Sequence, residues 1–289
     1  MALLEAQKLE YIYSQKTPFV KQAVKGVDFC VEKGEIVGII GHTGSGKSTL
    51  VQMLNGLLKP TSGSVTLNGE DIFANKKSLH NARFKIGLVF QYPEYQLFDE
   101  TVYKDISFGP SNMGLSKEEI DRRVISASKL VDLPHHLLEK SPFDLSGGEK
   151  RRAAIAGVVA MEPEILILDE PTAGLDPKGR QRILDMIVEL NKTTNTSVVI
   201  VSHNMEDIAK LCNKVLVLKG GEAVAFDTPE RIFAETDIIE NSGLILPTLT
   251  KMLISLKQKG LPVNIANFSK EDAVKEIIRL KKEGYKADA

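Results

Sequence analysis

The 289-residue sequence has no apolar run long enough to cross a membrane, because a spanning helix needs roughly 18 or more such residues in succession. The longest candidate, residues 153–161, is far shorter. Residues 1–6 contain no basic segment followed by an apolar run, so we expect no secretory signal. A role at a membrane would therefore require a partner protein that provides the span.

Excess charge and paired cysteines are also missing. The formal net charge is -1, which lacks the basic excess typical of nucleic-acid-binding proteins, and we expect no nucleic-acid partner. The net charge alone does not exclude a local basic patch. Cys30 and Cys212 are far apart and show no CxxC spacing, so we expect two buried, free thiols.

Short apolar runs alternate with helical patterns through the first 228 residues. Runs typical of buried strands occupy residues 36–40, 165–168, 197–201 and 215–218. Half-buried or meander strands are expected around residues 27–31 and 65–67. Three amphipathic helices are expected here. The first carries Leu50, Val51, Leu54, Leu57 and Leu58 on one face. The second begins at a Ser116–Glu119 capping box, and the third begins at Asp176 and Pro177. This order predicts an α/β fold with a largely parallel sheet beside an antiparallel β part.

From about Thr228 the pattern is helical only. We therefore expect a first domain over residues 1–228 and an appended helical segment over residues 229–289. One helix is expected after Thr228, a second after Pro247, and a third capped by Ser269. In the third helix, the apolar spacing predicts that Val274, Ile277 and Ile278 face inward.

Residues 41–48 read Gly-His-Thr-Gly-Ser-Gly-Lys-Ser and fit the P-loop pattern between an apolar strand and a helix. Glycines allow successive N–H groups to point at one anion, and the helix that begins near Lys47 adds its dipole. We expect Lys47 to meet the β- and γ-phosphates and the Ser48 hydroxyl to ligate Mg²⁺, whereas His42 is a variable position. The nucleotide-binding residues predicted here are Gly41, His42, Thr43, Gly44, Ser45, Gly46, Lys47, Ser48 and Thr49.

Residues 145–152, Leu-Ser-Gly-Gly-Glu-Lys-Arg-Arg, predict a second anion-binding helix start, with the Ser146 hydroxyl and the N–H groups of Gly147 and Gly148. A plain helix N-cap is the alternative. The segment resembles the signature of ATP-binding cassette (ABC) ATPases, with Glu149 where glutamine is commoner. The resemblance implies that the signature of one subunit faces the P-loop of its partner, so that ATP is held between two molecules.

Further segments resemble motifs of that family in its order. Residues 165–170, Ile-Leu-Ile-Leu-Asp-Glu, resemble its Walker B strand, which implies that Asp169 holds Mg²⁺ and that Glu170 polarises the attacking water. Gln91 resembles the glutamine that senses Mg²⁺ and that water. His203 resembles the histidine that contacts the γ-phosphate.

Two resemblances are less complete. Residues 173–176, Ala-Gly-Leu-Asp, resemble the D-loop and imply that Asp176 lies near the nucleotide, although many members have Ser-Ala in the first two places. Tyr13 aligns with the aromatic residue that stacks on adenine, and Tyr11 is the alternative. Packing in the core is the competing interpretation of both tyrosines.

Cassettes of this kind power importers, exporters, chromosome-structure ATPases and translation factors. Fewer than a hundred residues separate the P-loop from the signature, without sustained heptads, and the chain has one cassette. These features favour transport. A non-hydrolytic regulatory cassette and a nucleic-acid-linked ATPase are the competing classes.

Residues 91–102 and 105–110 resemble the ATPase subunits of energy-coupling-factor (ECF) transporters, in particular the second type in heterodimeric pairs. This implies an ATP-hydrolysing subunit that drives uptake of a vitamin or similar micronutrient from the cytoplasmic side of the cell membrane. Cobalt or nickel import and a non-transport ABC ATPase are the alternatives. The implied partners are a second ABC ATPase subunit, identical or homologous, a transmembrane coupling protein and a membrane substrate-binding subunit. Asp99, Glu100 and Asp105 are candidate contacts for a basic coupling helix, and the C-terminal extension is implied to pair the two ATPases.

Overall fold

The computed structural model describes residues 2–264, 270–283 and 285. Its strands are β1 (Leu4–Tyr13), β2 (Lys21–Val31), β3 (Ile36–Ile40), β4 (Ser62–Leu67), β5 (Glu70–Asp71), β6 (Ile86–Val89), β7 (Ile165–Asp169), β8 (Ser197–Val201), β9 (Lys214–Lys219) and β10 (Glu222–Asp227). Its α-helices are α1 (Lys47–Leu54), α2 (Lys76–Lys85), α3 (Val102–Asn112), α4 (Lys117–Leu130), α5 (Gly147–Val159), α6 (Pro177–Thr194), α7 (Met205–Leu211), α8 (Pro229–Ala234), α9 (Thr236–Asn241), α10 (Thr248–Gln258) and α11 (Lys270–Lys282). The 3-10 helices are η1 (Pro93–Gln96), η2 (His135–Leu137) and η3 (Pro142–Asp144).

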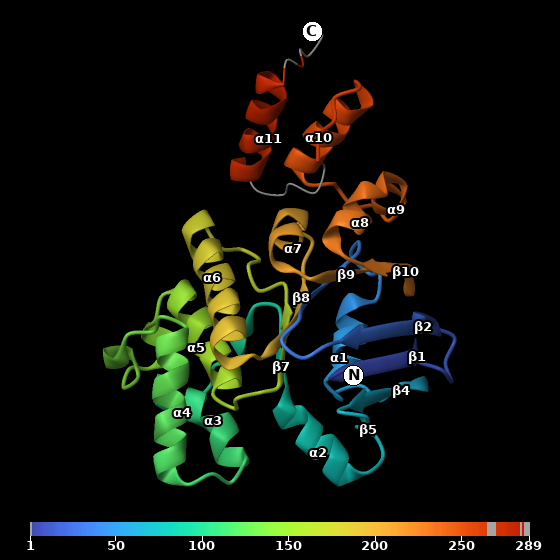
Figure 1. Ribbon diagram of the computed structural model, residues 1–289. Coiled ribbons are helices and arrows are strands. Elements are labelled where there is room, and N and C mark those ends of the chain that lie inside the picture. The colour runs from blue at the N-terminus through green and yellow to red at the C-terminus, as the bar shows by residue number, and fades with distance from the viewer. Residues whose placement is uncertain (1, 265–269, 284, 286–289) are drawn as a thin grey trace.

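The larger sheet has the strand order β10-β9-β3-β8-β7-β6, in which β10 alone runs antiparallel to its neighbour. Every residue of β3, β6, β7 and β8 is buried. Strands of a parallel sheet are covered on both faces, which is why they appear in the sequence as continuous apolar runs. The smaller sheet, β2-β1-β4-β5, is antiparallel. The predicted α/β architecture is therefore confirmed (Figure 1).

Two apolar cores cover the two faces of the larger sheet. On one face, Val37 and Ile39 pack with Leu50 and Leu54 of α1 and with the smaller sheet, so that α1 lies between the two sheets. On the other face, Ile36 and Ile40 join the core formed with the helices from α3 to α9. The alternation follows from the two-residue period of strand side chains.

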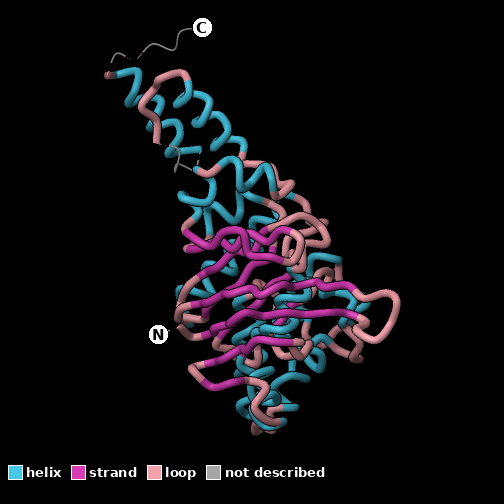
Figure 2. The backbone as a smooth tube through the Cα atoms, turned by 90° about the vertical axis from the view of Figure 1, so that its right-hand side faces the viewer, coloured by secondary structure: helices cyan, strands magenta, loops and turns pink. Residues whose placement is uncertain are grey.

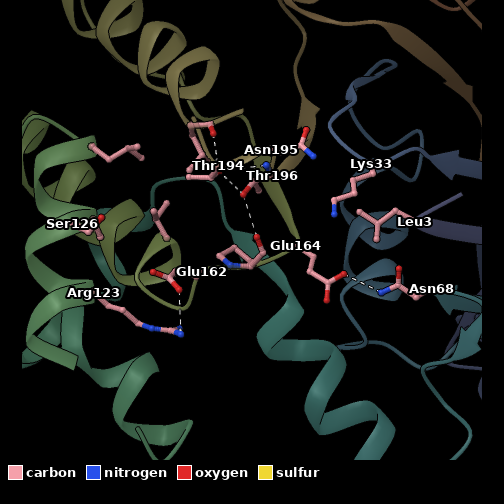
Figure 3. Close-up of a pocket in the computed structure, with 15 residues that line it drawn as sticks. Leu3, Lys33, Asn68, Arg123, Ser126, Glu162, Glu164, Thr194, Asn195 and Thr196 are labelled. Carbon is pink, nitrogen blue, oxygen red and sulfur yellow. Dashed lines mark hydrogen bonds and ion pairs between the residues drawn. The ribbon is translucent and has the colours of Figure 1, made fainter. Parts of the chain in front are cut away.

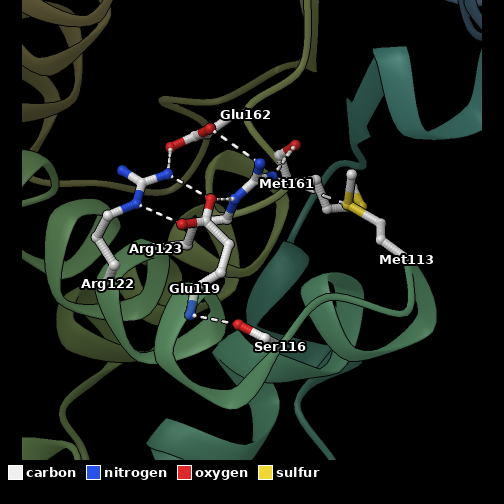
Figure 4. A network of polar contacts seen from close by, with 7 residues as sticks. All are labelled: Met113, Ser116, Glu119, Arg122, Arg123, Met161 and Glu162. Atoms are coloured by element: carbon white, nitrogen blue, oxygen red, sulfur yellow. Dashed lines mark hydrogen bonds and ion pairs between the residues drawn. The ribbon is translucent and has the colours of Figure 1, made fainter.

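A charged network fastens α4 to the turn after α5 (Figure 4). The Arg123 guanidinium donates to Glu119 Oε1 at 2.8 Å and to the Met161 carbonyl at 3.0 Å, and it pairs with Glu162 at 3.1 Å. Ser116 caps α4 as expected by accepting from the Glu119 amide. The carboxylate of Glu119 binds arginines instead of closing the predicted capping box.

The C-terminal helices extend away from the two sheets (Figure 2). Helices α8 and α9 bury Phe233 and Ile239 in the main core, whereas Leu253, Val263 and Leu280 form a separate cluster around α10 and α11. The predicted inward orientation of α11 is wrong: Val274, Ile277 and Ile278 are 53%, 37% and 49% exposed. The helix instead buries Ala273 and Leu280, and its other apolar residues form an uncovered face. The predicted cap, Ser269, lies outside the described residues.

Several local expectations need adjustment. The helix after the P-loop ends at Leu54, and Leu57 is exposed, because the chain turns at Gly56 with a φ of 78°. Cys212 is buried and Cys30 is half-buried, and both are free. Within the described part of the chain, no helix combines the length and the apolar character that crossing a membrane requires.

Candidate nucleotide site

A cavity of about 430 Å³ lies at the carboxyl ends of β3, β7 and β8, next to the start of α1. Ligands of open α/β sheets bind at this edge. Most of the predicted residues meet here although they are far apart in the sequence. The cavity is lined by Tyr13, Lys21, Ala23, Thr43, Gly44, Gly46, Lys47, Ser48, Thr49, Gln91, Asp169, Glu170 and His203.

The P-loop backbone leaves no room for side chains on its inner turns. A Cβ on Gly46 would lie 2.4 Å from the Ala23 carbonyl oxygen, and one on Gly41 would lie 2.4 Å from the Leu218 carbonyl oxygen. Gly46 precedes α1 with a φ of 103°, a left-handed conformation that favours glycine. The loop is therefore a backbone cradle that opens onto a helix N-terminus, which suits a phosphate group.

The Lys47 ammonium lies inside this loop and donates to the carbonyls of Gly41 at 2.7 Å and His42 at 2.9 Å. Burial lowers the pKa of Lys47, while the neighbouring carboxylates of Glu170 and Asp169 oppose this effect. A partly desolvated cation in an anion cradle attracts a phosphate strongly, because little solvent screens it.

Two oxygen ligands converge at the sheet edge. The Ser48 hydroxyl donates to Asp169 Oδ2 at 2.9 Å, from the start of α1 to the end of β7. Burial raises the pKa of the Asp169 carboxyl, and the hydrogen bond from Ser48 and the charge of Lys47 act against it. A hydroxyl and a carboxylate beside a phosphate cradle are the oxygen donors that Mg²⁺ prefers, so the donor set fits this ion.

Glu170 follows β7 with its backbone in the left-handed region at a φ of 51°. Its amide donates to the Val201 carbonyl at 2.9 Å, and its carboxylate, 12% exposed, lies 2.8 Å from His203 Nδ1. Non-glycine residues in this conformation cost of order 1–3 kcal/mol and concentrate at functional sites. The turn therefore holds a carboxylate at the cavity wall with an imidazole beside it.

Gln91 is exposed at the cavity wall, at the end of the segment that follows β6. Tyr13 also lines the cavity, and its hydroxyl lies 3.1 Å from Thr49 Oγ1. Its ring packs edge-on against Tyr11 with 4.7 Å between centroids. Tyr11 packs against the core of the smaller sheet, so Tyr13 is the aromatic residue presented to the cavity.

The signature residues lie elsewhere, at the start of α5. Ser146 accepts from the Glu149 amide, and Glu149 Oε2 accepts from the Ser146 hydroxyl at 2.6 Å and from its amide at 2.8 Å. These hydrogen bonds lower the pKa of Glu149. Ser146 and Gly147 are exposed, and no described atom lies within 4 Å of where a Gly147 side chain would start. This helix start is thus open to another molecule.

Known proteins are similar to this chain over nearly its whole length. The sequence pattern of the ABC transporter family matches residues 24–173. The energy-coupling factor transporter ATP-binding proteins EcfA2 of Caldanaerobacter subterraneus subsp. tengcongensis and Clostridium acetobutylicum are 50% and 51% identical, each over 96% of this chain and over 96% and 97% of their own. The chain belongs to the ABC transporter family, among its energy-coupling factor ATP-binding proteins. As a member it is an ATP-binding ATPase.

Solved structures of ABC proteins share the fold. The structure of cbiO1 from Clostridium perfringens, described as part of the ABC transporter complex cbiONQ, has a TM-score of 0.74 and 40% identity, over 88% of this chain and 99% of that one. The dimeric structure of MJ0796, a bacterial ABC transporter cassette, has a TM-score of 0.70 and 29% identity, over 78% and 98%. The resemblance inferred from the motifs is confirmed at the level of family and fold.

Some predicted residues of this ABC protein do not line the cavity. Asp176 caps α6 by accepting from the Gly179 amide at 2.9 Å. His42 is exposed and packs near Gly243, where an added Cβ would lie 3.9 Å from the His42 Cβ. Conversely, the lining residues Lys21 and Ala23 were not predicted, because nothing in the β2 sequence marks them.

A second cavity, of about 400 Å³, lies near the opposite end of β7 (Figure 3). Its wall includes Lys33, Arg123, Glu162 and Glu164, and Asn68 donates to Glu164 at 2.9 Å. Among the described residues, none of those predicted for the nucleotide site lines it. Its position at the amino ends of the parallel strands separates it from the phosphate cradle.

Proposed function

We propose that this chain is the ATP-hydrolysing subunit of an ECF-type importer and drives uptake of a vitamin or similar micronutrient from the cytoplasmic face of the cell membrane. One observation carries the ATPase role: Lys47, Ser48, Asp169, Glu170 and His203 line one cavity at the phosphate cradle. Cobalt or nickel import is the alternative within the related group, and a transport assay separates these cargoes.

The residues divide the chemistry among them. Lys47 and the loop amides bind the phosphates, and Ser48 and Asp169 would hold Mg²⁺ with Gln91 nearby. When bound, Mg²⁺ neutralises charge on the phosphate oxygens. Glu170 takes a proton from the attacking water, a contribution typically worth 10²–10⁴-fold in rate. His203, 2.8 Å from Glu170, orients that carboxylate. It would also contact the γ-phosphate.

The proposed working unit is a pair of ATPase subunits. The open start of α5, with Ser146, Gly147 and Gly148, would meet the γ-phosphate held by the partner subunit, and Tyr13 would stack on adenine. Helices have positive N-terminal ends, so two such ends from different molecules can clamp one phosphate. Closure and reopening would convert ATP binding and hydrolysis into a population shift that membrane partners follow.

Residues 229–289 are proposed as a helical extension beside a nucleotide-binding domain of residues 1–228. Val274, Ile277 and Ile278 form an exposed apolar face on α11. An uncovered apolar stripe suits an interface with another protein. We assign this face to pairing with the second ATPase subunit.

The coupling protein is proposed to dock in a groove of about 480 Å³ between α2, α3 and α5. The apolar side chains Phe84, Phe98 and Phe108 line the groove, and Phe98 and Phe108 are exposed. Of the three candidate acids, Asp105 accepts from the amides of Phe98 and Asp99, and Glu100 pairs with Lys104. The Asp99 carboxylate accepts from the Glu100 amide, and we assign to it the contact with a basic coupling helix.

The test uses the complex that co-purifies with the tagged chain after mild detergent extraction. Glu170→Gln should retain ATP binding and lose nearly all hydrolysis, because the amide cannot accept the proton. Glu164→Gln, at the opposite end of β7, is the matched control and should hydrolyse ATP normally. Normal turnover in Glu170→Gln would rule out the assigned role, and a complex without membrane proteins would rule out the transport role.

A further inference from the structure

A buried arginine connects segments that approach the nucleotide site from different parts of the chain. Arg151 lies on α5, five residues after Ser146, and is 2% exposed. Its guanidinium forms a bidentate pair with Glu94, with Nε at 3.0 Å from Oε2 and Nη2 at 2.8 Å from Oε1. Such planar, two-point contacts fix geometry as well as charge.

The third guanidinium nitrogen of Arg151, Nη1, reaches the turn that carries Glu170. Nη1 donates to the Ala173 carbonyl at 2.6 Å and to the Pro171 carbonyl at 3.3 Å. The Ala173 amide donates back to the Glu170 carbonyl at 3.1 Å. The left-handed conformation of Glu170 is therefore held by a turn whose outer carbonyls are bound to α5.

The other end of the clamp leads to Gln91. Glu94 lies in η1, three residues after Gln91. Between them, Tyr92 has a φ of 55°, and its ring centroid lies 5.8 Å from the Arg151 guanidinium carbon. A Cβ on Gly174 would lie 3.6 Å from the Tyr92 ring, so the D-loop backbone packs close to this aromatic side chain.

We propose that Arg151 is a positioning residue for ATP hydrolysis, which locks the Glu170 turn to the segment that carries Gln91 through Glu94. The inference rests on the proposed function of Glu170. Arg151 does not line the nucleotide cavity, so it acts through the two segments and not on the phosphates. Because the same helix begins at the signature, the clamp ties the placement of the water-activating groups to the position of α5.

The experiment compares Arg151→Met with Arg123→Met in the purified complex. Arg123 is the matched control: its side chain is 13% exposed, and it also binds carboxylates and a backbone carbonyl (Figure 4). It does not line the nucleotide cavity. Arg151→Met should lower kcat about 10- to 100-fold, the effect of misplacing reacting groups by about 1 Å, with the ATP affinity changed less than about threefold. Arg123→Met should leave both quantities near those of the wild type.

Hydrogen exchange gives a readout independent of turnover. In Arg151→Met, the amides of residues 170–174 and 92–96 should exchange faster, whereas Arg123→Met should affect α4 and the turn at Glu162. Arg151→Lys should not restore kcat, because an ammonium cannot span the carboxylate and both carbonyls. If Arg151→Met fails to assemble, Glu94→Gln should produce the same pattern more weakly.

The outcomes separate the two proposals. A kcat in Arg151→Met or Glu94→Gln equal to that of Arg123→Met, or full rescue by lysine, would overturn the positioning role. Normal hydrolysis in Glu170→Gln would instead overturn the proposed function, whatever the arginine variants show.

Discussion

The P-loop geometry predicts a large difference between two glycine substitutions that look alike in the sequence. Gly44 and Gly46 both have positive φ angles, 83° and 103°. Alanine in a left-handed conformation costs roughly 1–2 kcal/mol. About 0.4–1 kcal/mol of this is offset because alanine restricts the unfolded chain. Gly44→Ala, with no described atom within 4 Å of the new Cβ, should therefore destabilise the chain by roughly 0–1.6 kcal/mol.

Gly46→Ala adds a steric term. Its Cβ would lie 2.4 Å from the carbonyl oxygen of Ala23, a backbone atom of β2 that cannot rotate away. Overpacking of this kind costs typically 1–3 kcal/mol. The total for Gly46→Ala is thus roughly 1–4.6 kcal/mol, which is about 1–3 kcal/mol more than for Gly44→Ala and corresponds to several degrees in Tm for a chain of this size.

The sequence contains no tryptophan, so unfolding of the purified variants is best followed by far-UV circular dichroism in urea and on heating. The prediction concerns only the difference in the free energy of unfolding between the two variants. Errors from extrapolating both values to zero urea largely cancel in this difference. Equal destabilisation by the two substitutions, within about 0.5 kcal/mol, would refute the close contact between the P-loop and β2.

Two further predictions concern parts outside the cradle. Burial and a hydrogen bond to Asp121 raise the pKa of Tyr103 from 10.0 to about 12. The folded state favours the protonated phenol, so the stability that Tyr103 contributes is fully present below pH 10 and is lost as the pH rises towards 12. The Tm advantage of the wild type over Tyr103→Phe should therefore be larger at pH 8 than at pH 11.5. An advantage independent of pH would contradict this reasoning. Ile278→Glu should weaken pairing of the ATPase subunits, measured by light scattering, while the Tm of the single chain stays constant because Ile278 is 49% exposed. Lys282→Glu on the same helix is the control. Unchanged pairing in Ile278→Glu would contradict the assigned interface.

The parallel strands and the phosphate cradle could be predicted because local chemistry determines both. A strand covered on two faces must be apolar throughout, as in β3 and β7, and a backbone cradle needs glycines at fixed spacing. Strand β10 was not predicted, because an edge strand with exposed or half-buried residues lacks a continuous apolar run. Helix α3 was also missed, since Gly109 and Pro110 interrupt its pattern.

The orientation of α11 and the long-range polar contacts of Arg151 could not be predicted from the sequence. Spacing identified the apolar stripe of α11, but whether that stripe meets its own chain or a partner depends on what α10 can cover. Arg151 reads as one basic residue among several after the signature. Its partners Glu94 and Ala173 are 57 and 22 residues away, and only the fold brings them together.

The incomplete surfaces of the single chain point to one conclusion. Lys47, Ser48, Asp169 and Glu170 line the nucleotide cavity, while a second helix start, at Ser146, is capped and exposed to solvent elsewhere on the molecule. A helix terminus that already satisfies its own cap gains nothing for folding from exposed glycines, so their value lies in contact with another molecule. The same argument applies to the uncovered apolar face of α11. Exposed apolar side chains contribute little to the stability of one chain, so this face is also best explained by contact with another molecule. Under the proposed function both surfaces meet a second ATPase subunit, which favours a cycle in which association of the subunits is itself the nucleotide-dependent step.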